Sequence, residues 1–160
     1  MKPTLVLDYS PDSLLVHWLV LEKECPLDVE MQDPFPMEEV IKAPYYQDGD
    51  ILIYDHATLV QFLQERYPGE QLMPPDPVSR AQIRQACTLT SDPDVDLMPE
   101  IDAILGSGLK YLAGSGGFTL LDIYIGTWLS ERAREEDFSV RVSDYWKRIS
   151  SRPAFIEAAQ

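Results

Sequence analysis

The segment that most constrains the fold covers residues 43–68, with the sequence APYYQDGDILIYDHATLVQFLQERYP. Asp48-Gly49 is a strong signal for a tight hairpin turn between two short strands. The second strand runs directly through Asp55-His56 into an amphipathic helix whose apolar face is Leu59, Phe62, Leu63 and Tyr67. A helix start offers free backbone N–H groups and a partial positive charge, so this segment outlines a site for a carboxylate-bearing small molecule.

The residues before this segment predict a βαβ unit. Residues 4–8 form a short apolar strand, and apolar side chains recur at helical spacing over about residues 15–23. Residues 27–32 alternate between apolar and polar side chains, which predicts a half-buried strand. A crossover of this kind is right-handed and pairs its strands in parallel. Residues 33–42 are broken by prolines and too short for much of a second crossover helix, so the first half is βαβ followed by ββα.

The second half of the chain predicts helices alone. Four prolines fall within residues 68–77, which makes residues 69–78 the natural linker. Beyond it the pattern predicts helices at residues 79–89, within 97–112, at 119–134 and at 142–150, the last ended by Arg152-Pro153. Thr119 and Asp122 form a T-x-x-D capping box, which is a folding device and not a catalytic site. The expected domains are therefore residues 1–68 and 79–160.

The composition limits the classes of partner. The chain is 45% hydrophobic, enough to build a core, and its formal net charge is −14. Such a charge opposes direct binding to nucleic acid and to anionic membranes, because both need positive charge on the protein. Solubility alone explains a negative field, and attraction of a basic protein partner is the functional alternative. The acidic cluster within residues 92–102 has the same two interpretations, a solvated loop or a docking surface.

The remaining signals give no metal site and no targeting segment. Cys25 and Cys87 lie far apart in no metal-ligand or redox spacing, so we expect buried or idle thiols. The D-x-D-x-D run at residues 92–96 is not followed by the glycine and glutamate of a calcium loop. No apolar run approaches the roughly 18 residues that cross a bilayer. A strand-like segment follows Met1 in place of a signal peptide, so we expect a cytoplasmic protein.

Several local patterns, taken in order, resemble the glutathione S-transferase superfamily over the whole chain. Ala43-Pro44 is similar to the family's V-P dipeptide, whose proline is cis, and residues 55–56 fall where the family has E-S or D-S. The capping box at residues 119–122 and the sequence WKRISSRPAF at residues 146–155 resemble the family's buried N-cap and final helix. The resemblance implies an α/β plus all-α fold: a thioredoxin-like βαβ-ββα domain, a proline-rich linker and a shortened helical domain. It implies glutathione as the ligand.

The resemblance also places a thiol-activating hydroxyl after the first strand. Ser10, before Pro11, falls at the position of the family's catalytic serine, and Tyr9 and Ser13 are neighbouring candidates. A hydroxyl there could donate to the glutathione sulfur and lower the pKa of its thiol. The alternative is that Ser10 or Ser13 simply caps the following helix, as serine before an apolar run commonly does.

The same resemblance assigns binding roles around residues 43–56. Asp55 would accept a hydrogen bond from the γ-glutamyl ammonium of glutathione, and His56, in place of the family's serine, would donate to the γ-glutamyl carboxylate. A cis Pro44 would present the backbone groups of Ala43 and Tyr45 to a peptide ligand. The alternatives are an Asp55 that is only an N-cap, a His56 that is only a surface residue and a Pro44 that only sets the fold.

Two departures from the family pattern argue against transferase activity. Residues 33–42 leave Lys42 as the one cation where the family often has a helix with groups for the glycyl carboxylate. The helical half is several tens of residues short, so the two helices that wall the electrophile pocket are cut within residues 79–112. We expect a degenerate glutathione site in a non-catalytic protein that acts through protein interaction. The alternative is an active glutathione transferase or thiol-dependent enzyme that uses Ser10.

The linker region adds one further resemblance. Residues 72–84, LMPPDPVSRAQIR, are similar to stringent starvation protein A, a branch of the same fold that lacks transferase activity and contacts bacterial RNA polymerase. This similarity implies the transcription machinery as a partner, in addition to the basic protein partner that the negative charge would attract. Family members are often dimers through the helices that flank the linker, so a homodimer is a further expectation.

Overall fold

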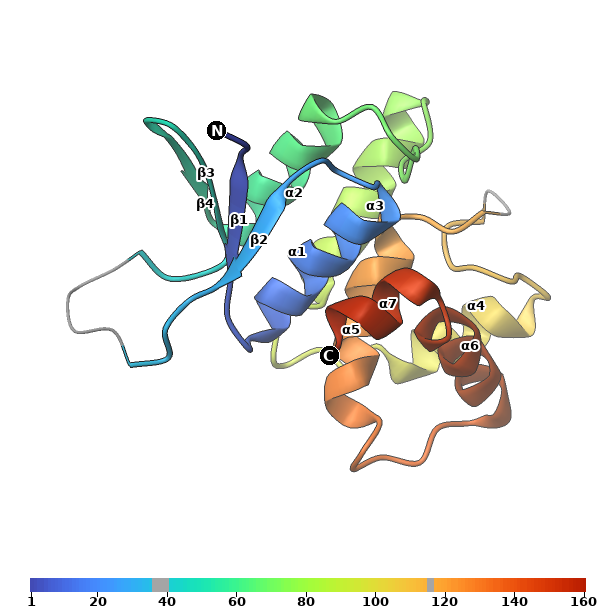
Figure 1. Ribbon diagram of the computed structural model, residues 1–160. Coiled ribbons are helices and arrows are strands. Elements are labelled where there is room, and N and C mark those ends of the chain that lie inside the picture. The colour runs from blue at the N-terminus through green and yellow to red at the C-terminus, as the bar shows by residue number, and fades with distance from the viewer. Residues whose placement is uncertain (36–40, 115–116) are drawn as a thin grey trace. The chain divides into compact units, whose positions relative to one another are not determined.

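The computed structural model describes residues 1–35, 41–114 and 117–160 (Figure 1). The chain divides into two compact units, Met1–Glu70 and Gln71–Ala158, which are described separately below. The division falls inside residues 69–78, the expected linker. Within the described ranges, no helix is both long and apolar enough to cross a membrane.

The first unit is a four-stranded mixed sheet with two helices. Its elements in chain order are β1 (Thr4–Leu7), α1 (Pro11–Glu22), β2 (Asp28–Met31), β3 (Tyr45–Asp48), β4 (Ile51–Tyr54) and α2 (His56–Arg66). The strand order is β2-β1-β3-β4, with β1 and β2 parallel and the other pairs antiparallel. This is the thioredoxin-like βαβ-ββα arrangement, so the predicted fold of the first half is confirmed.

The core of this unit lies between the sheet and its two helices, α1 and α2 (Figure 1). The register aligns Leu5 of β1 with Tyr46 of β3, so both side chains point to the same face of the sheet. The Tyr46 ring packs edge-on against Phe62 of α2, with 4.9 Å between the ring centroids. The helices contribute the fully buried side chains Trp18, Leu19, Leu59 and Leu63.

β2 is an edge strand, and its burial differs from the expectation. All four of its residues are exposed, including Val29 at 41% and Met31 at 51%. The prediction of a half-buried strand is therefore wrong, although the strand itself is present. Alternation of residue types indicates which side chains share a face, but it does not say whether a strand is central or at the edge. In this sheet β1 takes the central place, with Leu5 and Leu7 buried.

The second unit is all helical. Its helices are α3 (Pro77–Leu89), α4 (Met98–Gly106), α5 (Leu120–Arg132), α6 (Val140–Ser150) and α7 (Pro153–Ala158). α5 is the core helix, because residues 120–129 are all buried and both α3 and α6 pack against it. A sheet unit followed by a helical unit confirms the predicted α/β plus all-α class.

The predicted capping box fixes the N-terminus of α5. The Thr119 N–H donates to the Asp122 carboxylate at 2.9 Å, and the Thr119 hydroxyl accepts from the first turn of the helix. Asp122 is fully buried and also accepts the Leu112 N–H at 3.2 Å and the Tyr145 hydroxyl at 2.7 Å. One carboxylate therefore ties α5 to the preceding loop and to α6, which is a structural role.

The helix α7 extends the fold beyond what the sequence predicts. α6 ends at Ser150, but Pro153 begins a new helix where the pattern predicts a stop, and the Ile156 N–H donates to the Arg152 carbonyl at 3.1 Å. Proline suits the first turn because its fixed φ is helical and no partner is needed there for the missing N–H. Proline after a helix can thus end one helix and begin the next.

Candidate functional site

The candidate thiol-activating group lies at the junction of β1 and α1. Ser10 is the N-cap of α1, and Pro11 stands in the first helical turn. The Ser10 hydroxyl oxygen accepts a hydrogen bond from the Ser13 N–H at 3.3 Å. Ser10 therefore caps a helix in this structure, which is one of the two roles open to it from the sequence. The neighbouring candidate Tyr9 is 83% exposed.

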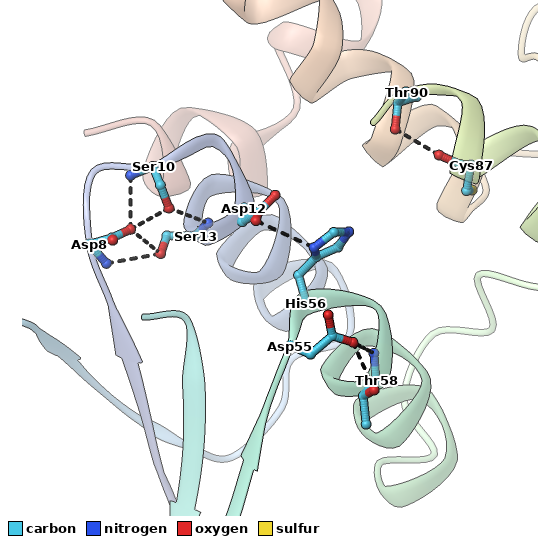
Figure 2. A network of polar contacts seen from close by, with 9 residues as sticks. All are labelled: Asp8, Ser10, Asp12, Ser13, Asp55, His56, Thr58, Cys87 and Thr90. Atoms are coloured by element: carbon cyan, nitrogen blue, oxygen red, sulfur yellow. Dashed lines mark hydrogen bonds and ion pairs between the residues drawn. The ribbon is translucent and has the colours of Figure 1, made fainter. Parts of the chain in front are cut away.

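The hydroxyl proton of Ser10 is donated to Asp8, the residue after β1 (Figure 2). Asp8 Oδ1 also accepts the Ser10 N–H at 2.9 Å and the Ser13 hydroxyl at 2.7 Å. The Asp8 N–H in turn donates to the Ser13 hydroxyl oxygen at 3.0 Å. A serine hydroxyl has a single proton to give, so both serines direct theirs to one carboxylate oxygen.

The electrostatics of this junction favour a charged Asp8. Burial raises the pKa of Asp8, but the hydrogen bonds from Ser10 and Ser13 and the charge of Lys42 outweigh burial, so the pKa lies below the ordinary 3.8. The positive charge of Lys42, the one cation of residues 33–42, thus acts on Asp8. A carboxylate next to Ser10 opposes a thiolate at the same place, because like charges disfavour ionisation of the thiol.

Asp55 is the N-cap of α2. Its Oδ2 accepts the Thr58 N–H at 3.1 Å and the Thr58 hydroxyl at 2.9 Å, and these two bonds hold the pKa of Asp55 below its ordinary value. The backbone of Asp55 has φ +68° and ψ +117°, which residues with a side chain rarely adopt. Of the roles open to Asp55 from the sequence, the structure shows the capping one.

His56 is the first residue of α2, and its side chain faces α1 (Figure 2). Its Nδ1 lies 3.4 Å from Oδ2 of Asp12, which stands in the first turn of α1. This pair joins the starts of the two helices within the first unit. The side chain that the resemblance assigns to a ligand carboxylate is thus directed at a carboxylate of the chain itself.

The Ala43–Pro44 peptide bond is cis, as the resemblance implies. The Ala43 N–H donates to the side-chain oxygen of Gln32 at 3.2 Å, and Gln32 Nε2 donates to the Ile41 carbonyl at 2.6 Å. Tyr45 begins β3, where it is in register with Val6 of β1. The backbone N–H of Ala43, expected to face a peptide ligand, is therefore bonded within the chain.

The sequence did not identify Asp8, Asp12 and Gln32 as the partners of Ser10, His56 and Ala43. Asp8 could have been found, because an aspartate two residues before an N-cap serine commonly accepts that serine's N–H as an Asx turn. Asp12 and Gln32 gave no comparable signal, since their partners His56 and Ala43 lie far along the chain.

Both cysteines are free. Cys25 is half-buried and Cys87 is buried, and burial raises the pKa of their thiols to about 11 and about 12. Within the described ranges no group of three His, Cys, Asp or Glu side chains could hold a metal ion. The structure thus contains two free thiols, of which Cys87 is buried as expected.

Comparison with known proteins supports the fold through structure alone. No protein-family model matches the chain, and no curated protein matches it in sequence. A glutathione S-transferase from the Antarctic clam Laternula elliptica aligns with a TM-score of 0.81 at 19% identity, covering 99% of this chain and 92% of that one. The theta class transferase from Xanthomonas axonopodis pv. citri, solved with glutathione bound, gives a TM-score of 0.80 at 18% identity, covering 100% and 98%.

A third match is FzlA from C. crescentus, with a TM-score of 0.79 at 17% identity, covering 99% of this chain and 92% of that one. The matched proteins thus include transferases with glutathione bound and a protein of another name. Structural similarity at this level of sequence identity establishes the fold but not the activity, which depends on the residues of the site. The chain has the fold of the glutathione S-transferase superfamily.

Proposed function

We propose that this chain is a glutathione transferase-like protein without transferase activity, and that it acts by binding another protein. The observation that carries the first part is the hydrogen bond from the Ser10 hydroxyl to Asp8. A serine that activates glutathione must direct its one hydroxyl proton at the sulfur. Here Asp8 takes that proton and adds a negative charge beside it, so a thiolate would gain no stabilisation from Ser10.

The other groups assigned to glutathione also have partners inside the chain. Asp55 is bonded twice to Thr58, and His56 faces Asp12. The Ala43 N–H is bonded to Gln32. A ligand would have to replace these contacts, and the carboxylates of Asp12 and Asp55 offset the partial positive charge that a helix start offers to an anion. These contacts support a degenerate glutathione site.

The charge distribution supports the second part of the proposal. Residues 1–70 contain 14 acidic and 4 basic side chains, a net charge of −10 out of the −14 of the whole chain. A field of this sign and size speeds the encounter with a basic protein and repels acidic ones. A basic protein partner is therefore the class that we propose, with the transcription machinery as the source that the linker similarity suggests.

An active transferase or thiol-dependent enzyme that uses Ser10 is the second candidate, and one backbone feature favours it. The His56 N–H stands at the start of α2, where a helix offers its free N–H groups to a carboxylate. In such an enzyme the glutathione sulfur would have to replace Asp8 as the acceptor of the Ser10 proton. Asp8 is therefore the residue that separates the two candidate functions.

The test combines thermal unfolding in millimolar glutathione with conjugation of glutathione to a model electrophile. If glutathione binds the native state, a free concentration of about 100 times its Kd would add roughly 2.7 kcal/mol to the stability of the protein, which is a clear shift in Tm. We expect no saturable shift and no conjugation for the wild type, and the same for Ser10→Ala. Asp8→Ala, which frees the Ser10 hydroxyl, is the variant in which any residual glutathione binding would emerge.

Conjugation by the wild type that Ser10→Ala abolishes would overturn the non-catalytic proposal and establish the enzyme. Asp94→Ala is the matched control for Asp8→Ala, because it removes one carboxylate from an exposed loop of the second unit. It should behave as the wild type in both assays.

A further inference from the structure

The last strand of the first unit is an apolar sheet edge. β4 stands at the end of the order β2-β1-β3-β4, and β3 is its one partner among the described strands. Ile51, Leu52 and Tyr54 are 56%, 37% and 60% exposed. Figure 1 shows the β3–β4 hairpin at the outer side of the sheet. An edge of this kind offers a row of backbone N–H and C=O groups for pairing with another chain.

The hairpin geometry identifies which backbone groups point outward. The pair Asp48–Ile51 closes a two-residue turn in which Gly49 has φ +59°, as a type II′ turn requires at its first central position. The closing pair of such a hairpin exchanges both hydrogen bonds, and bonded and non-bonded pairs then alternate along the ladder. Leu52 and Tyr54 therefore turn their N–H and C=O groups away from β3.

The same two residues present exposed side chains. Side chains alternate along a strand, so Leu52 and Tyr54 lie on the face of the sheet opposite the Tyr46–Phe62 contact. Each of them thus combines outward backbone groups with an exposed apolar or aromatic surface. A peptide strand that pairs with β4 could bury both at once.

The charged side chains in the sequence between Lys42 and Arg66, which includes β4, are acidic. Residues 43–65 contain four acidic residues and no lysine or arginine. Asp48 and Asp50 stand before the strand, and Asp55 follows it directly. An apolar strand flanked by carboxylates at both ends is complementary to an extended segment with apolar residues at its centre and basic residues around them.

We propose that β4 binds an extended basic segment of a partner protein by strand addition. The inference rests on the proposed function, because it names the surface through which a non-catalytic protein would act. Backbone hydrogen bonds to Leu52 and Tyr54 would supply the pairing, and lysine or arginine side chains near Asp50 and Asp55 would supply the selectivity.

A second copy of this chain is the less favourable occupant. Pairing of two β4 strands would place Asp48, Asp50 and Asp55 of both copies around one short interface. Neither segment has a lysine or arginine to balance them, and like charges across paired strands are destabilising. The charge that attracts a basic segment therefore disfavours self-association through this edge.

The test uses the full chain and three labelled peptides of alternating residues: valine and lysine, valine and glutamate, and valine and lysine with N-methylated amides. Fluorescence anisotropy should show that the unmodified valine–lysine peptide binds saturably and that the other two peptides do not. N-methylation keeps the charge and removes the backbone donors, so its loss of binding separates strand addition from simple charge attraction. On binding, the amides of Leu52 and Tyr54 should gain protection from hydrogen exchange.

Two variants locate the surface. Leu52→Pro removes an N–H that points away from β3, a place where edge strands accept proline. Tyr54→Lys adds a repelling charge without touching the ladder and serves if Leu52→Pro fails to fold. Each should weaken the valine–lysine peptide about tenfold, as expected for the loss of one main-chain bond or one favourable contact. Val78→Lys, at a residue of α3 that is 65% exposed, is the matched control and should bind as the wild type.

The inference is overturned if the N-methylated peptide binds equally well, or if Tyr54→Lys keeps full affinity. It is also overturned, in favour of a second copy, if the protein is a dimer that Tyr54→Lys dissociates. These outcomes can be distinguished from those that test the proposed function. A protein that binds the peptide and also conjugates glutathione would contradict the non-catalytic proposal and support strand addition at β4. A protein that neither conjugates glutathione nor binds the peptide would support the non-catalytic proposal and contradict strand addition.

Discussion

The Ser10 hydroxyl, at the position of a catalytic serine, gives its proton to the Asp8 carboxylate two residues earlier. The same carboxylate oxygen holds the Ser13 hydroxyl and the Ser10 N–H, so it organises the whole turn between β1 and α1. This arrangement explains why a cap and a catalytic donor are hard to separate at this place in the fold. One hydroxyl can serve either purpose, and the neighbouring acceptor decides which.

The first prediction concerns the stability that Asp8 provides. Asp8→Ala leaves three donors without their acceptor and should lower the free energy of unfolding by about 1–3 kcal/mol at neutral pH. Because the folded pKa of Asp8 is lowered, its contribution is present above the ordinary pKa of 3.8 and is lost as the pH falls through the folded pKa. Urea unfolding of both proteins between neutral pH and pH 3 measures this difference.

The gap between the wild type and Asp8→Ala should therefore narrow on acidification. A gap that stays constant down to pH 3 would mean that Asp8 acts by packing and not by its charge. Asp94→Ala, in an exposed loop, provides the baseline for the loss of one carboxylate.

The second prediction concerns backbone strain at Asp55. Asp55→Ala loses both bonds to Thr58 and keeps φ at +68°, so it should lower the free energy of unfolding by about 1–2 kcal/mol. Asp55→Gly loses the same bonds, but glycine accepts this φ freely and should recover about 1 kcal/mol of that loss. Chemical denaturation of both variants checks the order.

Asp76 provides the matched comparison, because it caps α3 through the Ser79 N–H at 2.7 Å with an ordinary φ of −69°. Glycine is better than alanine at any N-cap, so the meaningful quantity is the alanine-to-glycine difference at each position. That difference should be larger at Asp55 than at Asp76. Equal differences would show that Asp55 carries no strain.

The elements of the fold that follow from local chemistry could be predicted from the sequence. The hairpin around Gly49 depends on one φ that glycine accepts, and the start of α5 depends on Thr119 and Asp122, three residues apart. Both signals lie within a few residues of the structure that they specify, so no knowledge of the tertiary fold was needed.

The candidate site could be predicted only in part, because the partners of its side chains come from residues that are distant in the sequence. Its residues were identified from a family resemblance, but the groups that engage them were not. His56 meets Asp12 across two helix starts, and Gln32 reaches Ala43 after the chain has turned back. The exposure of β2 has the same origin, since the strand order is set by tertiary pairing and not by the alternation within one strand.

The third prediction concerns the buried Asp122. Burial raises the pKa of Asp122, and the Tyr145 hydroxyl at 2.7 Å is one of three donors that oppose this effect. Tyr145→Phe should lower the free energy of unfolding by about 1–3 kcal/mol at neutral pH and raise the pKa of Asp122 further. Tyr9→Phe, at a residue that is 83% exposed, should have no effect.

The loss of stability in Tyr145→Phe should depend on pH. A raised folded pKa means that the contribution of Asp122 to stability declines as the pH rises past the ordinary 3.8. The variant raises that pKa further, so its deficit should be larger at pH 7 than below pH 3.8. A deficit that is independent of pH would assign the loss to packing of the ring alone.

The fourth prediction concerns thiol reactivity. With pKa values raised to about 11 and about 12, Cys25 and Cys87 hold far less thiolate at pH 8 than thiols with the ordinary pKa of 9.0. Because the thiolate is the reacting form, alkylation by iodoacetamide should be at least roughly 100-fold slower in the native protein than in urea. Cys25, being half-buried, should react before Cys87. Rapid labelling of the native protein at either position would contradict these pKa shifts.

The last prediction concerns the end of the first unit, where the chain fits closely against Lys23. A Cβ at Gly69 would lie 2.2 Å from the Lys23 carbonyl oxygen, and the buried Lys23 ammonium holds the Glu70 carbonyl at 2.9 Å. Gly69→Ala must therefore move the backbone of residue 69 away from Lys23, although the Lys23–Glu70 hydrogen bond holds the two segments together. The variant should lower the free energy of unfolding by about 1–3 kcal/mol. A Cβ at Gly117 meets no atom of the described residues within 4 Å, so Gly117→Ala should leave stability unchanged within about 0.5 kcal/mol. Equal stability of the two variants in urea unfolding would show that residues 69–70 separate from Lys23 at little cost.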